Sequence, residues 1–237
     1  FTRSGSTWSQ QAKIQSSDVQ SSDNFASSIS INSDGSYVIA GAYGDDTVAG
    51  ADQAGAAYVF SRSGSTWTQQ QKIQSSDIQP NDYFGESVSI NGDGTYAIIG
   101  ARDEDTGASG FGSAYIFTRS GSTWSQQAKI QSSDTPGFQS FGASVSISSN
   151  SNFAIVCSDY ETTGGSNAGA SYIFSRSGST WTQDAKLVTS DIQAGDAIGF
   201  GGAGAAMSSD GSYVIVGAYG EDTGGSNAGA AYVFKAG

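Results

Sequence analysis

Histidine is absent from this 237-residue chain, which also has only one cysteine, one methionine and two prolines. Without histidine the chain lacks the commonest general base, the histidine-containing catalytic triads and most zinc sites. Cys157 has no partner within the chain, so an intramolecular disulfide is excluded and cysteine usage does not reveal the redox compartment. These absences predict a protein that is not an enzyme.

Positive charge is also scarce. The chain has 10 basic and 22 acidic residues, a formal net charge of -12, and 14% charged residues in all. Binding to nucleic acid or to an anionic membrane needs a basic surface, so neither is an expected partner. No apolar run approaches the roughly 18 residues of a membrane-spanning helix, so membrane insertion is not expected either. Solubility rests on Ser, Thr, Gln and Asn, a composition typical of extracellular β proteins.

What the chain does have is an internal repeat. The hexapeptide Arg-Ser-Gly-Ser-Thr-Trp occurs four times, so a tryptophan recurs every 57 to 59 residues, as Trp8, Trp67, Trp124 and Trp181. Each repeat holds four short β-rich segments, and the first two are joined by Asp-Gly, a hairpin signal, at 34–35, 93–94 and 210–211. The third repeat has residues 149–152 there instead, where we expect an asparagine to take the positive φ.

Four strands per repeat at this period are typical of a β-propeller, in which four-stranded sheets repeat around a central axis. We therefore predict an all-β fold, a single propeller domain over residues 1–237 with four four-stranded blades. The expected blades are 15–73, 74–130, 131–187 and 188–237. In the outer strand of the first blade, simple alternation places Trp67 and Ile73 on the same face.

The first and last residues of the chain fall at matching points of the repeat. Phe1 corresponds to Phe60, the end of a third strand, so residues 1–14 supply only an outer strand, while the last repeat stops at Phe234 without one. We expect residues 1–14 to complete the last blade and so close a ring of four. A neighbouring molecule that donates the strand is the alternative.

Several of these segments resemble the FG-GAP repeat of integrin α-chain propellers and of microbial and algal surface proteins. The resemblance rests on residues 84–90, on Ile99-Gly100-Ala101 and on the later Gly-Ala-Ala-Tyr-Val-Phe, and Phe-Gly recurs at 141–142 and loosely at 200–201. It implies a propeller used outside the cell, at the cell surface, for adhesion or assembly. Propellers of this family usually have seven blades, so four repeats correspond to a minimal ring or to part of a longer array.

The same resemblance raises the question of calcium. The family's cation loop lies between the first two strands, but this chain has tight Asp-Gly turns there, and a two-residue turn cannot surround calcium with 6 to 8 oxygens. A second acidic loop offers candidate metal ligands, Asp45 and Asp46 in the first repeat and Asp103 and Asp105 in the second. The alternative, which we favour, is that these side chains shape solvated turns.

The four repeated tryptophans are candidate ligand-binding residues. Trp8, Trp67, Trp124 and Trp181 offer rings that can stack on sugars, with Gln and Asp as hydrogen-bonding partners. The alternative is that a tryptophan at a fixed repeat position packs between blades.

The sequence thus predicts a non-catalytic, extracellular structural or adhesive module without a required cofactor. Its expected partners are other protein subunits or copies of itself in a coat, wall or flagellar hair, because near-identical repeats present similar faces for lateral assembly. Two alternatives stay open, a multivalent glycan-binding propeller and a calcium-dependent adhesion domain.

Overall fold

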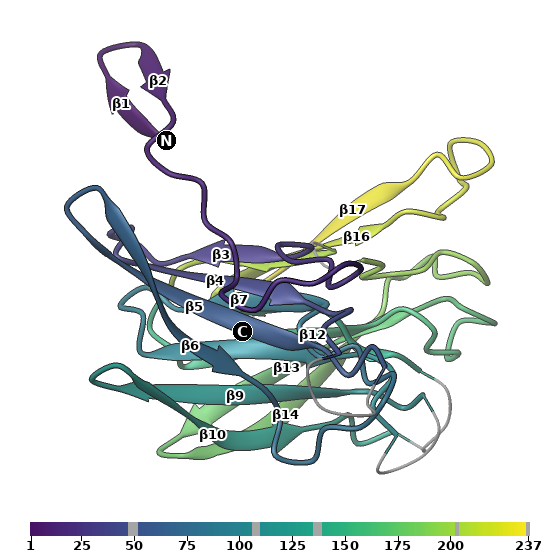
Figure 1. The fold of residues 1–237 in the computed structure, drawn as a ribbon. Helices are drawn as coiled ribbons and strands as arrows, with labels where there is room; N and C mark the ends of the chain where they lie inside the picture. Colours follow the sequence, from purple (N-terminus) through teal and green to yellow (C-terminus); the bar gives the residue numbers. More distant parts are fainter. Residues whose placement is uncertain (47–51, 106–109, 135–138, 202–203, 236–237) are drawn as a thin grey trace.

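The chain folds entirely into β-strands, turns and loops in the part that the structure describes. The computed structural model describes residues 1–46, 52–105, 110–134, 139–201 and 204–235 (Figure 1). The strands are β1 (Thr2–Ser4), β2 (Thr7–Ser9), β3 (Ile29–Ile31), β4 (Tyr37–Ala42), β5 (Ala56–Ser63), β6 (Thr66–Ile73), β7 (Ser87–Ile90), β8 (Tyr96–Ala101), β9 (Ser113–Ser120), β10 (Thr123–Ile130), β11 (Phe141–Ile147), β12 (Phe153–Ser158), β13 (Ala170–Ser177), β14 (Thr180–Leu187), β15 (Ala205–Met207), β16 (Tyr213–Ala218) and β17 (Ala230–Lys235).

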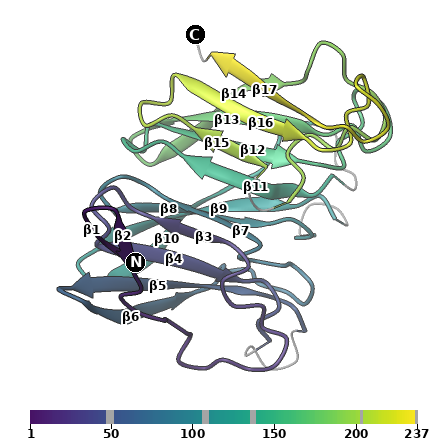
Figure 2. The ribbon, with the colours of Figure 1, turned by 90° about the horizontal axis from the view of Figure 1, so that it is seen from above.

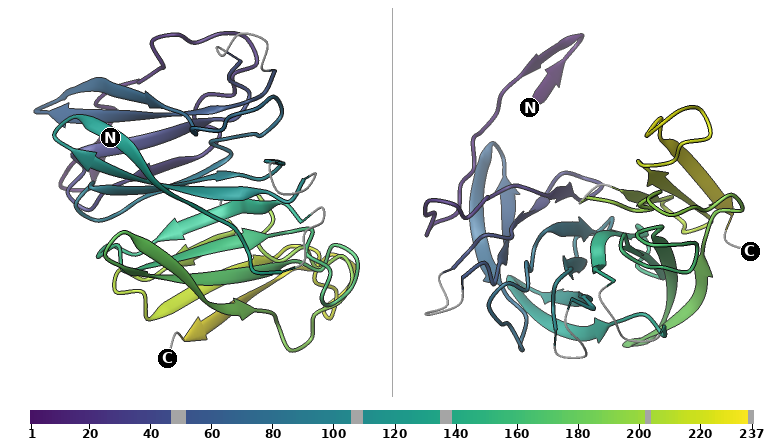
Figure 3. Two further views of the ribbon diagram at one scale, coloured as in Figure 1. Left: turned by 90° about the horizontal axis from the view of Figure 1, so that it is seen from below. Right: turned by 90° about the vertical axis from the view of Figure 1, so that its right-hand side faces the viewer.

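Each repeat forms one antiparallel sheet whose strands pair in chain order. Strands β3 to β6, β7 to β10 and β11 to β14 form three four-stranded sheets, here called blades 1 to 3, and β15 to β17 form blade 4 with three strands. The sheets stack side by side around an arc (Figures 2 and 3). The predicted all-β propeller architecture is therefore confirmed.

The predicted closure of the ring is wrong in this structure. Residues 1–14 do not join the last blade: β1 pairs with β2 in a separate two-stranded hairpin, and the sheet of blade 4 ends at β17. The hairpin and β17 lie toward opposite ends of the arc (Figure 1 and the right-hand view of Figure 3). They do not pair because residues 11–17 are held on blade 1, which lies far along the arc from β17: Trp67 Nε1 donates to Gln11 Oε1 at 3.1 Å, and Ser17 N donates to Gln69 Oε1 at 2.9 Å.

The apolar core lies between neighbouring blades. At the first junction Ile39, Val59 and Ile73 of blade 1 pack against a set from blade 2 that includes Val88 and Phe117. The same repeat positions fill the junctions between blades 2 and 3 and between blades 3 and 4. Because each sheet buries both faces, its strands carry apolar residues on both sides, as stacking of blades requires.

A β-bulge in the outer strand overturns the predicted alternation. The register of β5 with β6 shifts between Val59 and Phe60, which leaves Gln70 as the extra residue. An extra residue reverses which side chains share a face. In blade 2, accordingly, Trp124 packs toward the preceding blade whereas Ile130 of the same strand packs toward the following one.

Two local predictions for the third and fourth repeats are also corrected. In the third hairpin Ser151, not an asparagine, has the positive φ (58°), because it occupies the position of Gly35. In the fourth repeat Ile198, not Phe200, stands where Phe84 and Phe141 stand, since Ile198 forms the same parallel bridge, to Gly169.

Candidate functional site

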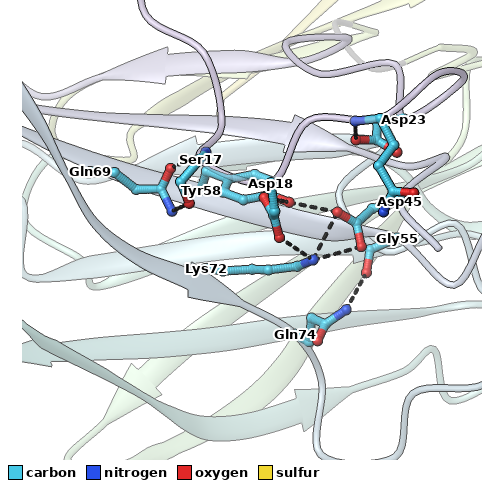
Figure 4. A network of polar contacts seen from close by, with 10 residues as sticks. Ser17, Asp18, Asp23, Asp45, Gly55, Tyr58, Gln69, Lys72 and Gln74 are labelled. Carbon is cyan, nitrogen blue, oxygen red and sulfur yellow. Dashed lines mark hydrogen bonds and ion pairs between the residues drawn. The ribbon is translucent and has the colours of Figure 1, made fainter. Parts of the chain in front are cut away.

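A lysine-centred polar network joins the inner and outer parts of blade 1 (Figure 4). Lys72 Nζ lies 2.8 Å from Asp45 Oδ1 and 3.0 Å from Asp18 Oδ2. The Tyr58 hydroxyl oxygen lies 2.9 Å from Asp18 Oδ1 and 2.5 Å from Asp45 Oδ2, and the two carboxylates share its single hydrogen as acceptors. Asp45 is fully buried, so one cation and one hydroxyl compensate the cost of burying its charge.

The same network recurs in the next two blades. Lys129 bridges Asp77 and Glu104 at 2.8 and 2.9 Å, and Lys186 bridges Asp134 and Glu161 at 2.6 and 3.0 Å. Burial opposes the charge of Lys129, but its bonds to the two carboxylates outweigh burial and raise its pKa. Likewise burial acts to raise the pKa of Asp77, and the bonds from Lys129 and Tyr115 bring that pKa below its usual value.

The fourth blade has the acidic half of the network, but in the described residues it has no lysine at the network position. Glu221 is buried and accepts a hydrogen bond from Thr223 N at 2.8 Å, the bond that Glu161 accepts from Thr163 N. Burial and a hydrogen bond to Asp191 raise the pKa of Tyr232. In the described residues no ion pair involves Glu221 or Asp191. The lysine is missing because it belongs to the outer strand, which this blade lacks.

The four candidate metal ligands do not come together. Asp45 is bonded to Lys72, and Asp103 forms an ion pair with Arg102 at 3.5 Å, while Asp46 and Asp105 are exposed. Among the described residues no group of three or more His, Cys, Asp or Glu is arranged to hold a metal. The geometry at Asp45 is that of an ion pair, and calcium binding through these loops stays a prediction without a site in the described structure.

The four candidate tryptophans have unequal environments. Trp124 is 3% exposed and Trp181 9%, both within blade junctions, and Trp67 is half-buried with its ring nitrogen bonded to Gln11. Trp8, on the N-terminal hairpin, is 63% exposed. A buried ring cannot stack on a sugar, so the packing interpretation fits Trp124 and Trp181, and Trp8 is the ring most available to a ligand.

One charged cluster was missed by the sequence analysis. Arg102 Nη1 lies 3.1 Å from Glu86 Oε1, and Asp159 is buried nearby in blade 3. Burial raises the pKa of Glu86 to about 7 and that of Asp159 to about 6. The signal was present: Glu86 stands where the other repeats have uncharged residues, and Arg102 and Asp159 share a repeat position at which the first and fourth repeats have a tyrosine.

The terminal blades expose apolar side chains that the inner blades bury. Ile29 of β3 is 69% exposed, whereas Val88 and Val145 at the same repeat position are buried. At the other end Val233 of β17 is 65% exposed, whereas Val59 is buried. Each exposed face matches a face that is elsewhere covered by a neighbouring blade.

Fold and repeated networks together define a β-propeller of tandem repeats. A model of the FG-GAP repeat matches residues 8–60, 67–117, 124–174 and 181–234. The chain belongs to the FG-GAP repeat family, as the resemblance of its sequence indicated. A comparison with curated protein sequences finds no match, and no helix in the described part of the chain is long and apolar enough to cross a membrane.

Two solved structures are similar to this chain at low sequence identity. Hydrazine synthase of Kuenenia stuttgartiensis superimposes with a TM-score of 0.55 and 14% identity over 94% of this chain and 49% of that chain. TolB from Acinetobacter baumannii gives a TM-score of 0.46 and 14% identity over 88% of this chain and 43% of that chain. The chain spans about half, or less, of the length of these structures. The similarity to hydrazine synthase concerns the fold alone.

Proposed function

We propose that this FG-GAP propeller is a non-catalytic structural or adhesive module of an extracellular assembly such as a cell-surface coat, wall or flagellar hair. The observation that carries the proposal is that the charged residues recurring in each repeat are bonded to one another. In blades 1 to 3 each lysine is bound to two carboxylates of its own repeat, so these groups serve the architecture of each blade. A catalytic site needs a cleft with groups held ready for a substrate, and these groups are bonded to one another.

Composition and exposed surfaces support the same proposal. The chain carries few charges and many small polar residues, which suits a secreted β protein. The apolar faces of blades 1 and 4 are of the kind that marks a protein interaction surface. An assembly subunit with two such faces needs no pocket for a small molecule.

Localisation in the native source tests the proposal. An antibody to the chain should label intact, unpermeabilised cells, and the protein should be recovered with the insoluble extracellular fraction rather than the cell lysate. As a control, a cytosolic marker should appear only in the lysate. Recovery of the chain with that marker would contradict an extracellular structural role.

A further inference from the structure

Lys13 has the repeat position of the three network lysines and lacks their partners. It corresponds to Lys72, Lys129 and Lys186, five residues after each conserved tryptophan. Lys13 is exposed, and no ion pair in the described structure involves it. Blade 4 has the opposite arrangement. Asp191, buried Glu221 and Tyr232 are present, but among the described residues no cation forms an ion pair with the two carboxylates. The two ends of the chain are therefore complementary in charge.

The apolar faces are complementary in the same sense. Ile215 and Val233 of blade 4 have the repeat positions of Ile39 and Val59, which are buried against the inner strands of the following blade. Ile29 of blade 1 has the position of Val88, which is buried against the preceding blade. The outward face of blade 4 and the outward face of blade 1 are thus the two halves of the junction that occurs three times within the chain.

The backbone of blade 4 has room for this junction. At Gly41 and Gly100 an added Cβ would collide with the carbonyl oxygen of the next blade, that of Gly85 or Gly142. At Gly217, the equivalent residue of blade 4, the nearest atom to an added Cβ is the Gly204 oxygen at 3.8 Å, within the same blade. The position that receives a neighbouring carbonyl at the first two junctions is open here.

We infer that a second copy of this chain docks head to tail on blade 4: its residues 10–14 pair with β17 as the fourth strand, its Lys13 enters the Asp191–Glu221 site, and its blade 1 covers Ile215 and Val233. The inference deepens the proposed function, on which it rests, by naming the partner in the assembly. The segment and blade 1 dock as a unit, because residues 11–17 are already bonded to the outer strand of blade 1.

The contacts between residues 11–17 and blade 1 repeat those inside the chain. Ser17 N donates to Gln69 as Ser76 N donates to Gln126 and Ser133 N to Gln183. The N-terminal segment therefore lies where the outer strand of a preceding blade lies. The last blade of another copy is that preceding blade. A contact of this type is heterologous, so it generates a closed ring or an open chain of copies.

A disulfide trap tests the strand pairing directly. Val59 of β5 pairs with Gln71 of β6, so the equivalent partners across the junction are Val233 of one copy and Ala12 of the other. A Val233→Cys copy mixed with an Ala12→Cys copy should form a disulfide-linked heterodimer, since cross-strand Cβ atoms lie close enough for a bond. A Gln71→Cys copy is the control, because that residue already pairs within its own blade. Crosslinking no stronger than this control would overturn the inference.

Association in solution provides the second test. The wild-type chain should have a mass above the 24.2 kDa monomer in analytical ultracentrifugation. Gly217→Ala fills the open position and Glu221→Lys reverses the charge of the site, so each should shift the chain to monomer, whereas Asp52→Lys, with the same change in charge, should not. A wild-type chain that stays monomeric, or a doubly substituted Ala12→Cys/Val233→Cys chain whose disulfide forms only within the monomer, would overturn docking of a second copy. If the chain associates in this way but is found inside the cell, the proposed function is contradicted and the inference about docking is not.

Discussion

Lys129 and Glu104 form a buried ion pair with 2.9 Å between Nζ and Oε1, and the Glu104 side chain is fully buried. The lysine comes from the outer strand β10 and the glutamate from the loop after β8, so the pair connects strands that are not neighbours in the sheet. The contact therefore fixes the position of the loop against the outer strand of the blade.

Lys129→Met should destabilise the protein strongly. It leaves the Glu104 carboxylate buried without its cation, which costs about 3 kcal/mol of unfolding free energy. Urea denaturation at pH 7 measures the loss, and Lys129→Met/Glu104→Gln should recover part of it because the unpaired charge is gone. A single variant as stable as the wild type would show that water replaces the lysine.

Stability should depend on pH through Asp82. Burial raises the pKa of Asp82 to about 7, against about 3.9 for an unfolded aspartate, so its contribution to stability is full below pH 4 and is lost as the pH rises through 7. Asp77 and Asp134 have lowered pKa values, so the stability that they contribute is present above about pH 4 and is lost as the pH falls further. The melting temperature should therefore be highest near pH 4 and should fall as the pH rises from 4 to 7.

Asp82→Asn isolates this effect. The amide keeps an oxygen for the hydrogen bond that Gln79 N donates to the carboxylate at 2.7 Å, and it carries no charge. The variant should gain about 4 kcal/mol over the wild type at pH 8 and almost nothing at pH 4, since the folded and unfolded pKa values differ by about three units and each unit corresponds to about 1.4 kcal/mol. Equal gains at both values of pH would contradict the titration of Asp82 as the cause.

Two equivalent glycines should respond differently to alanine. Gly100→Ala puts a methyl group against the Gly142 carbonyl oxygen and the Ser87 hydroxyl, and overpacking of this kind costs about 1–3 kcal/mol. Gly217→Ala meets open space and should stay within about 0.5 kcal/mol of the wild type for the monomer. Thermal unfolding at a low protein concentration compares the two. Similar losses would mean that the strand itself, and not the blade junction, requires glycine.

The two tryptophans with the most different exposure provide a further comparison. Trp124→Ala should cost about 3–5 kcal/mol because it empties part of a blade junction, whereas Trp8→Ala should change stability by less than about 0.5 kcal/mol. A glycan array with the folded Trp8→Ala variant then tests the lectin alternative. Sugar binding by the wild type that Trp8→Ala abolishes would favour a glycan-binding propeller over a purely structural module.

The sequence by itself determined the repeat, the four strands of each repeat and the family, because local hairpin signals and alternation act over a few residues and recur at a fixed period. Asp34-Gly35 marks the turn between β3 and β4, and the apolar runs of β4 and β5 are long enough to define buried strands. The same reasoning named Asp45 but did not identify its partner, because Lys72 lies 27 residues away on a strand that is paired through β5.

Only the tertiary structure decided which residues face which blade and whether the ring is closed. The bulge at Gln70 places Trp67 and Ile73 on opposite faces of the sheet. The repeat period of the sequence does not indicate this one-residue insertion in the strand pairing. Closure depends on the angle at which one blade packs on the next, which is set by the fit of side chains such as Val59 and Val88 across the junction. Those contacts join residues of different repeats, so their geometry exists only after the blades have stacked.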